Sequence, residues 1–202
     1  GGQNWDLMSD EGKWLAFDAD GRTMYRSWEG GILVSPDRGE TWTTIDMPLG
    51  MPEGIDAHPR REGRLFAYPY SPNVLAISDD RGESWEWAAG MRKLKNARLY
   101  FGHDPGQVVY AISEAGEWLY RSEDDGKNWV QCGSPDARYS DTGTRLAIDP
   151  RDSQRLFLAT WGRGVLVSED GCRSWTPRNQ GLESQTVNSI AIDPHTPSTI
   201  YA

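Results

Sequence analysis

Short apolar runs recur along the whole chain, and clusters of Gly, Pro, Asp and Ser separate them. Within the runs, apolar positions alternate with polar ones or follow one another only briefly, as in residues 155–159 and 165–168. Alternation with a period of two and short apolar runs predict β-strands. The intervening Asp, Pro and Gly dipeptides are strong turn formers. The pattern therefore predicts an all-β chain of many short strands.

One apolar run ends in an Asp-Pro, His-Pro or Asp-Gly turn and returns at a regular interval. Its copies are Leu15–Gly21, Ile55–Pro59, Phe101–Pro105, Leu146–Pro150 and Ile190–Pro194. Each copy predicts a strand followed by a tight turn. A regular interval of this kind indicates one structural unit repeated in tandem.

A second element, an octapeptide, keeps the same interval. Its copies are Ser35–Trp42, Ser78–Trp85, Ser122–Trp129 and Ser168–Trp175, with Ser-to-Ser spacings of 43, 44 and 46 residues. In the fourth copy Gly171 stands one place early, and Cys172 takes the position that Gly occupies in the others. The turn of this copy is therefore the least well predicted.

Each repeat is interpreted as four strands. In the fourth repeat they are expected at 145–148, 155–159, 165–168 and from about 174. A four-stranded antiparallel unit of about 44 residues, repeated in tandem, predicts a β-propeller blade. We predict one domain over residues 1–202, with blades at about 11–49, 50–93, 94–139 and 140–184 and a split blade from 185–202 plus 1–10.

The octapeptide resembles the Asp-box, or BNR repeat, of sialidases, xyloglucan-degrading endoglucanases and sortilin-type receptors. The resemblance covers nearly the whole chain and implies a β-propeller. The residues themselves agree, because Asp accepts backbone N–H bonds across a turn, Gly permits a positive φ and Trp buries a large ring. The residues expected to have this structural role are Ser35, Asp37, Gly39, Trp42, Ser78, Asp80, Gly82, Trp85, Ser122, Asp124, Gly126, Trp129, Ser168, Asp170 and Trp175. Each loop offers too few oxygens for calcium.

The two ends of the chain leave two interpretations open. Gly1–Trp5 matches the second half of an Asp-box, and Ile190–Ala202 supplies two strands of a blade. The chain is either about five blades closed by both termini or a fragment of a larger propeller. An incomplete blade exposes a strand edge that another chain can pair with. The first residue is Gly1, which is consistent with removal of an upstream segment.

Composition narrows the class of partner. The chain has 202 residues, with 21 Lys and Arg against 30 Asp and Glu, and a net charge of -9. Nucleic acids and anionic membranes need clustered basic charge, so neither is expected as the main partner. No apolar run approaches the roughly 18 residues of a membrane span. The family resemblance favours a secreted or periplasmic location. Two cysteines are not a disulfide framework, and the sequence does not favour a Cys132–Cys172 bridge over free thiols.

Blade topology sorts the loops onto two faces. The loops between the second and third strands and those between blades share one face, which we call the loop face. Propellers generally bind ligands on this face, so the candidate ligand-binding residues are Trp28, Tyr70, Arg138, Tyr139, Trp161 and Arg163. Trp28 and Trp161 occupy matching positions. Each ring could stack on a sugar or pack between blades, and packing is the favoured interpretation. For Arg163 a local structural role is favoured, and the basic cluster 92–95 is interpreted as a solvated loop.

Candidate catalytic residues are weaker. Glycoside hydrolysis needs two carboxylates roughly 5–10 Å apart. Glu29, Glu114 and Asp141 are expected on the loop face, but their spacing marks no pair. The Arg-Ile-Pro motif of sialidases is absent, and xyloglucanases place their two catalytic Asp residues between two propellers. The three histidines follow the repeat rather than a metal-ligand spacing, so neither a metal nor a cofactor is expected.

The sequence is compatible with two functions. The first is a non-catalytic module that binds a glycan or a protein through the loop face. The alternative is a glycoside hydrolase, or part of one, that uses paired carboxylates. The carboxylate pair would discriminate them, since a pocket lined by aromatic rings without such a pair favours binding.

Overall fold

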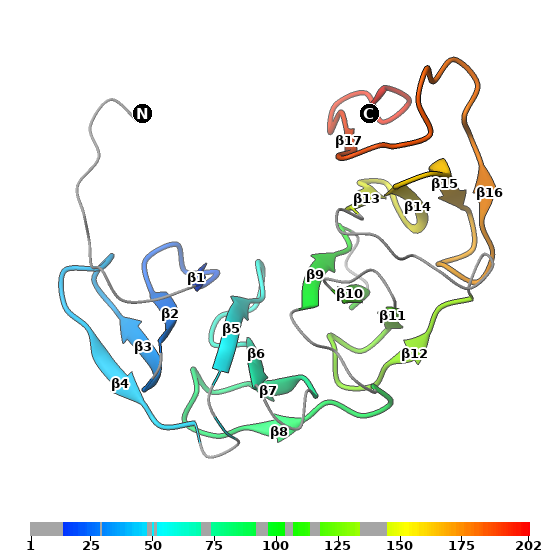
Figure 1. Cartoon of the computed structure of the whole chain (residues 1–202). Helices are drawn as coiled ribbons and strands as arrows, with labels where there is room; N and C mark the ends of the chain where they lie inside the picture. The colour runs from blue at the N-terminus through cyan, green and yellow to red at the C-terminus, as the bar shows by residue number, and fades with distance from the viewer. Residues whose placement is uncertain are drawn as a thin grey trace. The chain divides into compact units, whose positions relative to one another are not determined.

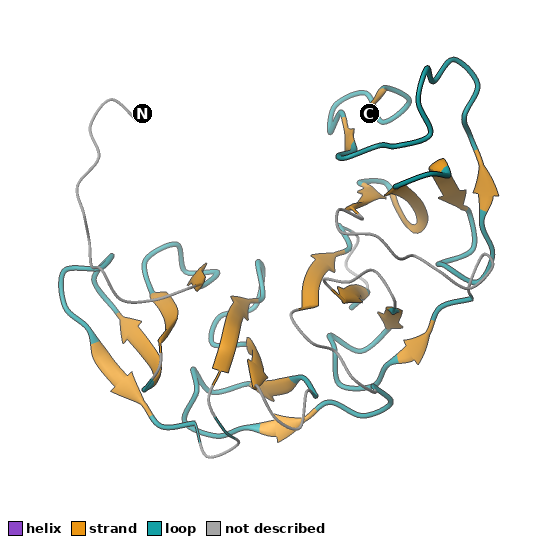
Figure 2. Cartoon of the chain, viewed as in Figure 1, coloured by secondary structure: helices purple, strands orange, loops and turns teal. Residues whose placement is uncertain are grey.

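The computed structural model describes residues 14–28, 30–47, 50, 52–69, 74–91, 97–103, 107–113, 118–133 and 145–202. These residues form strands and turns but no helix (Figures 1 and 2). They form four antiparallel sheets of four strands each and one sheet of two strands. The predicted all-β fold of four-stranded antiparallel blades is thereby confirmed. The described residues contain no helix long and apolar enough to cross a bilayer.

The chain divides into two compact units, residues 1–87 and 88–202. Unit 1 holds the first two blades. Blade 1 consists of β1 (Trp14–Phe17), β2 (Met24–Trp28), β3 (Gly31–Ser35) and β4 (Thr43–Ile45). Blade 2 consists of β5 (Pro52–Ala57), β6 (Leu65–Pro69), β7 (Ala76–Ser78) and β8 (Glu86–Trp87).

Unit 2 holds two further blades and the two-stranded sheet. Blade 3 consists of β9 (Ala97–Phe101), β10 (Val109–Ser113), β11 (Leu119–Ser122) and β12 (Val130–Gln131). Blade 4 consists of β13 (Arg145–Asp149), β14 (Asp152–Thr160), β15 (Gly164–Ser168) and β16 (Thr176–Pro177). The last sheet pairs β17 (Ala191–Ile192) with β18 (Ile200–Tyr201). The predicted closure into one domain, which also uses residues 1–10, lies outside the described residues and stays a prediction.

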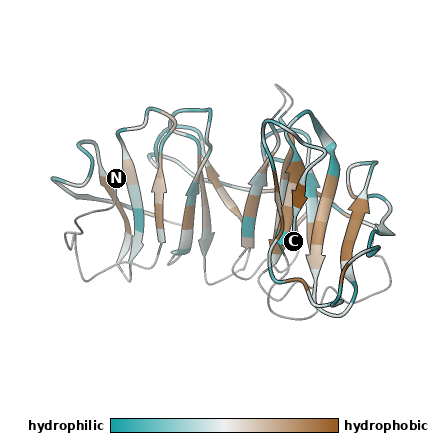
Figure 3. Ribbon diagram, turned by 90° about the horizontal axis from the view of Figure 1, so that it is seen from above, coloured by the Kyte–Doolittle hydropathy of each residue, from teal (hydrophilic) through white to brown (hydrophobic). Residues whose placement is uncertain are grey.

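Burial follows the order of strands within a blade. All residues of β6 and β10, the second strands of their blades, are buried, whereas β8, β12 and β16 at the outer edge are exposed. Continuous apolar runs therefore mark the strands that are covered on both faces. In Figure 3 the strongest hydrophobic colour lies on strands.

Apolar side chains of consecutive blades pack together within each unit. In unit 1 the buried members of this core are Ala16, Tyr25, Ile32, Ile55, Leu65, Ala67 and Ala76. In unit 2, blades 3 and 4 share a core that includes Tyr110, Leu119, Leu146, Leu156 and Leu158. A second core packs Val187 and Ile190 against Phe157 and Val165. Apolar faces buried between blades are the main stabilising term.

The Asp-box turns share one hydrogen-bond pattern. In the first box the hydroxyl of Ser35 donates to Asp37 over 2.7 Å and accepts the Gly39 amide, also over 2.7 Å. The carboxylate of Asp37 accepts the amide and the hydroxyl of Thr41 over 2.9 and 2.6 Å. The indole N–H of Trp42 donates to the carbonyl of Gly39 over 3.1 Å. The turn thus satisfies its own polar groups.

These contacts lower the pKa of the box carboxylates. The hydrogen bonds from Thr41 lower the pKa of Asp37 to about 2. The hydroxyl of Ser174 is the main cause of the same effect in the fourth box, where the pKa of Asp170 is about 2. Hydrogen bonds to an ionised carboxylate favour that form.

The fourth box departs from the pattern, as its sequence does. Cys172 supplies the amide that donates to Ser168, over 2.9 Å. The buried indole nitrogen of Trp175 makes no hydrogen bond within the described residues. Cys172 is bonded to Cys132, so the sequence interpretation that disfavoured this bridge is wrong. A count of cysteines could not reveal that the repeat brings their Cα atoms to 5.3 Å.

Candidate functional site

The hairpin between β14 and β15 carries the most exposed described aromatic side chain of the predicted ligand set. Trp161 begins this hairpin, and 44% of its surface is exposed. Gly162 and Gly164 have φ angles of 90° and 72°, which an L side chain adopts only with strain. The two glycines thus close the turn tightly, and nearly half of the Trp161 surface stays exposed.

The segment that follows β16 holds this hairpin in place. Trp161 pairs with Thr186 in an isolated antiparallel bridge. The carbonyl of Gln185 accepts the amides of Gly162 and Gly164 over 2.9 and 2.6 Å, and the amide of Val187 donates to Thr160 over 3.0 Å. Two kinds of loop that share the loop face therefore meet at Trp161.

The side chain of Asn179 makes two further hydrogen bonds to the same hairpin. Its Oδ1 accepts the amide of Val165 over 2.9 Å, and its Nδ2 donates to the carbonyl of Arg163 over 2.9 Å. A hairpin backbone held by several hydrogen bonds loses little conformational entropy when a ligand binds. The geometry is therefore that of a preorganised aromatic surface.

Trp28, at the matching position of blade 1, lies differently. It is half-buried, and its indole nitrogen is buried without a hydrogen bond among the described residues. A Cβ placed on Gly30 would fall 2.2 Å from the ring, so the ring covers its own turn. In blade 4, Arg163 stands at the position of Gly30, and a side chain there leaves no room for this arrangement.

Several residues of the predicted ligand-binding and catalytic sets lie outside the part of the chain that the structure describes. Glu29, Glu114 and Asp141, the candidate acids, lie outside the described residues, as do Tyr70, Arg138, Tyr139 and the basic cluster 92–95. Arg163 is described and exposed. No group of three or more metal-ligating side chains occurs in the described part of the chain.

An aromatic cluster on the inner strands of unit 1 was missed by the sequence analysis. Trp14 in β1 is 42% exposed. A Cβ placed on Gly54 would lie 3.3 Å from both the Trp14 ring and the Tyr68 ring. The hydroxyl of Tyr68 donates to Asp56 over 2.7 Å. Burial, and then the charge of Asp56, raises the pKa of Tyr68, so this phenol stays protonated and donates.

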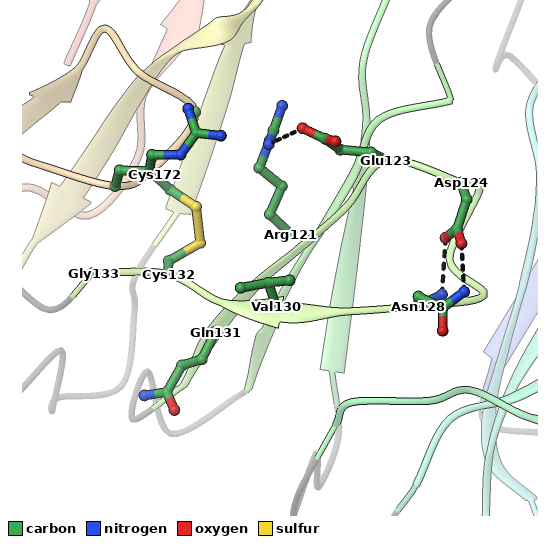
Figure 4. A pocket seen from close by; sticks show the side chains of 11 residues that line it. Arg121, Glu123, Asp124, Asn128, Val130, Gln131, Cys132, Gly133 and Cys172 are labelled. Atoms are coloured by element: carbon green, nitrogen blue, oxygen red, sulfur yellow. Dashed lines mark hydrogen bonds and ion pairs between the residues drawn. A yellow bond between two sulfur atoms is a disulfide. The ribbon is translucent and has the colours of Figure 1, made fainter.

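A pocket of about 370 Å³ lies at the Asp-box turns of blades 3 and 4 rather than on the loop face. Figure 4 shows Arg121 paired with Glu123 on one side and the disulfide on the other. No sequence pattern pointed to this pocket, because its walls come from two repeats joined by the unexpected bridge.

Comparison with known proteins agrees with the repeat pattern. The family model of the BNR-Asp box repeat matches residues 119–132, which contain the third octapeptide. The chain carries Asp-box repeats. The predicted resemblance to Asp-box propellers is confirmed by this match together with the four-stranded blades.

Curated relatives of this chain include xyloglucanases. The chain is similar to xyloglucanase Xgh74A of Acetivibrio thermocellus, with 27% identity over 214 residues that cover 98% of this chain and 24% of that protein. A xyloglucanase of a Paenibacillus species is 25% identical over 210 residues, which cover 96% of this chain and 20% of the relative. The chain thus spans about a quarter of the length of the curated relatives it matches.

Solved structures show the same fold. An ancestral GH74 enzyme has a TM-score of 0.68 and 16% identity, covering 95% of this chain and 28% of that chain. The GH74 xyloglucanase from Xanthomonas campestris has a TM-score of 0.61 and 23% identity, covering 89% of this chain and 26% of that chain. Both are propellers, and at this identity the likeness establishes the fold alone.

Proposed function

We propose that this chain is a carbohydrate-binding segment of an Asp-box glycoside hydrolase and that its ligand is a β-linked glucan of the xyloglucan class. The observation that carries the proposal is Trp161, an exposed tryptophan on a hairpin whose backbone is held by hydrogen bonds. The names of the relatives, which are xyloglucanases, supply the substrate class.

The chemistry of the site suits a neutral sugar. An indole ring combines an apolar face, which can cover the C–H surface of a sugar ring, with a polar N–H at its edge. A net charge of -9 opposes anionic ligands but not an uncharged glucan. Because the hairpin is held before binding, little of the interaction energy is lost in ordering it.

Hydrolysis by a longer protein is the second candidate, and the names of the relatives favour it. It requires two carboxylates on the loop face at the separation that glycoside cleavage needs. Glu29, Glu114 and Asp141 remain the proposed acids. Binding through Trp161 and cleavage elsewhere on the same glucan are compatible roles.

Isothermal titration calorimetry tests the binding proposal. The wild-type chain and the Trp161→Ala variant are titrated with a xyloglucan oligosaccharide, with cellohexaose and with mannohexaose. We expect the xyloglucan oligosaccharide and cellohexaose to bind and mannohexaose not to bind. Loss of a central aromatic contact should weaken affinity about 30-fold, or about 2 kcal/mol.

Trp87→Ala is the matched control, because Trp87 is 40% exposed but lies on the outer strand β8. Its affinity should equal that of the wild type. Equal affinities for the wild type and Trp161→Ala would overturn the proposal. A reducing-sugar assay on the same samples tests the second candidate: release of reducing ends that disappears in Glu29→Ala, Glu114→Ala or Asp141→Ala would support catalysis.

A further inference from the structure

The fourth Asp-box places a cysteine where the backbone favours glycine. Cys172 has a φ of 72°, whereas Gly39, Gly82 and Gly126 at the same position of the other boxes have 92°, 93° and 89°. A residue with a Cβ adopts this region only at an energetic cost. The preceding residue, Gly171, is the glycine displaced by one place. The backbone therefore keeps the shape of the box although the residue type opposes it.

The partner of Cys172 explains why a cysteine stands there. Cys132 follows β12, the outer strand of blade 3, and is joined to Cys172 across 40 residues of sequence. The amide of Gly133 donates to the carbonyl of Cys172 over 3.0 Å. A Cβ on Gly133 would fall 2.1 Å from the carbonyl oxygen of Arg173, so the two segments touch. The outer edge of blade 3 is thus fastened to the turn of blade 4 by one covalent bond and one hydrogen bond.

This disulfide borders the pocket of about 370 Å³, whose walls include both cysteines, Arg121 and Arg173. Pockets above about 300 Å³ admit small organic molecules. The side chain of Arg121 reaches the cysteine turn, because a Cβ placed on Gly171 would lie 3.0 Å from its Nε. Figure 4 shows the guanidinium of Arg121 turned toward Glu123, its ion-pair partner.

We propose that the Cys132–Cys172 bond is a thiol–disulfide exchange site, which small dithiols entering this pocket cleave while the protein stays folded. Cleavage removes the covalent link between the outer strand of blade 3 and the Asp-box of blade 4, so that only the hydrogen bond from Gly133 to Cys172 joins these segments. The inference is independent of the proposed sugar site, which lies on the other face of the blades.

The exchange has two balanced steps. A thiolate of the dithiol attacks Sγ of Cys132, the more exposed of the two residues at 7% against 2%, and forms a mixed disulfide. Cys172 leaves as a thiolate and takes a proton from water. The second thiol of the reagent, as its thiolate, displaces Cys132, which leaves as a thiolate and takes a proton from water. The reagent ends as a cyclic disulfide and the protein as two thiols.

A positive charge in the pocket should favour the first step. A neighbouring positive charge lowers the pKa of a thiol, and a leaving thiol of lower pKa departs faster. Arg173 lines the pocket together with both cysteines, so its positive charge should favour the departure of Cys172, whereas the charge of Arg121 is already balanced by Glu123. The box residues that hold Cys172, chiefly Ser168, are not consumed by the reaction and keep the turn in place.

The test measures the rate of cleavage against the concentration of dithiothreitol under native conditions, with alkylation and mass spectrometry as the readout. Attack on the folded protein predicts a rate that is proportional to reagent over at least a tenfold range and is unchanged by low urea concentrations, whereas attack through the unfolded state rises steeply with urea. A rate that becomes constant at high reagent and equals the unfolding rate would overturn the proposal, since cleavage would then require unfolding. Resistance to the reagent at every concentration would overturn it as well.

Two variants separate the site from general accessibility. Arg173→Gln should slow cleavage about threefold, whereas Arg38→Gln, at the first box, should leave the rate unchanged. The double variant Cys132→Ser with Cys172→Gly mimics the opened bond and restores glycine at positive φ. Its amides at 130–133 should exchange hydrogen at least tenfold faster than in the oxidised wild type. Equal protection would show that the disulfide does not hold the outer strand.

Discussion

The hairpins of blade 1 and blade 4 present the same residue in two different ways. In unit 1 the Trp28 ring lies over its own turn, against Gly30. In unit 2 the Trp161 ring is 44% exposed and its hairpin is fixed by the segment around Thr186. The matching position in the repeat therefore specifies an indole ring but not its role. The neighbouring residue, Gly30 in one hairpin and Arg163 in the other, accounts for the difference.

The two tryptophans show that one position of the repeat can serve either packing, as Trp28 does, or ligand binding, as we propose for Trp161. A ring that covers its turn contributes packing, and its loss opens a void. A ring held in solvent contributes little to stability and is available to a ligand. Substitutions at the two positions should therefore affect different measurements.

The largest expected effect is on stability, from Trp28→Ala. Removing this half-buried ring should lower the free energy of unfolding by about 3 kcal/mol, because its contacts are lost and a cavity remains. Trp161→Ala should change it by less than about 0.5 kcal/mol. Urea unfolding of both variants checks this. A comparable loss in the two variants would show that Trp161 also packs as scaffold.

A smaller effect is expected from Gly30→Ala. The added Cβ would collide with the Trp28 ring, so the ring must leave its turn, at a cost of about 1–3 kcal/mol. The reciprocal change, Arg163→Gly, should let Trp161 fold over its turn. The ¹⁹F spectrum of protein labelled with 5-fluorotryptophan follows both rings. An unchanged resonance of Trp161 in Arg163→Gly would mean that Arg163 does not keep the ring exposed.

Asn179→Ala should cost about 1–2 kcal/mol, because it removes two hydrogen bonds to the Trp161 hairpin. The same variant should weaken oligosaccharide binding several-fold, since a mobile ring must be ordered by the ligand. Thermal unfolding and calorimetric titration measure the two effects. Lower stability with unchanged affinity would contradict the view that Trp161 is preorganised.

The smallest effect concerns acid and should be alike in both units. The pKa of Asp37 in blade 1 and of Asp170 in blade 4 is about 2, below the ordinary 3.8. Their contribution to stability is therefore present above about pH 4 and is lost as pH falls toward 2. Asp37→Asn should flatten the pH dependence of the unfolding midpoint in this range. A midpoint equally sensitive to acid in this variant would assign the loss to other groups.

Much of the fold could be predicted because the same sequence pattern recurs in each blade. Alternating runs and turn dipeptides gave the strands, and the octapeptide gave the turns where Ser35 and Asp37 bond. Differences appear at strand ends: the strand expected at 155–159 is β14, Asp152–Thr160, and the last strand begins at Thr176 rather than near 174. End residues depend on pairing with the neighbouring strand, which a local pattern does not contain.

The contacts between repeats could not be predicted in the same way. The buried carboxylate of Asp18 accepts the amide of Gly63 over 3.0 Å, across 45 residues of sequence. The Cys132–Cys172 bond likewise joins different blades. Neither of these two contacts recurs in the other blades among the described residues, so the periodicity of the sequence does not reveal them. The exposure of Trp161 had a local signal in Arg163, but its meaning depends on where the Trp28 ring lies.

The most direct test of the account is calorimetric titration of a xyloglucan oligosaccharide into the wild type, Trp161→Ala and Trp87→Ala. We predict that the wild type and Trp87→Ala bind with equal affinity and that Trp161→Ala binds about 30-fold more weakly while unfolding at the wild-type urea concentration. Undiminished binding by Trp161→Ala would contradict it, because the displayed ring would then have no part in recognition.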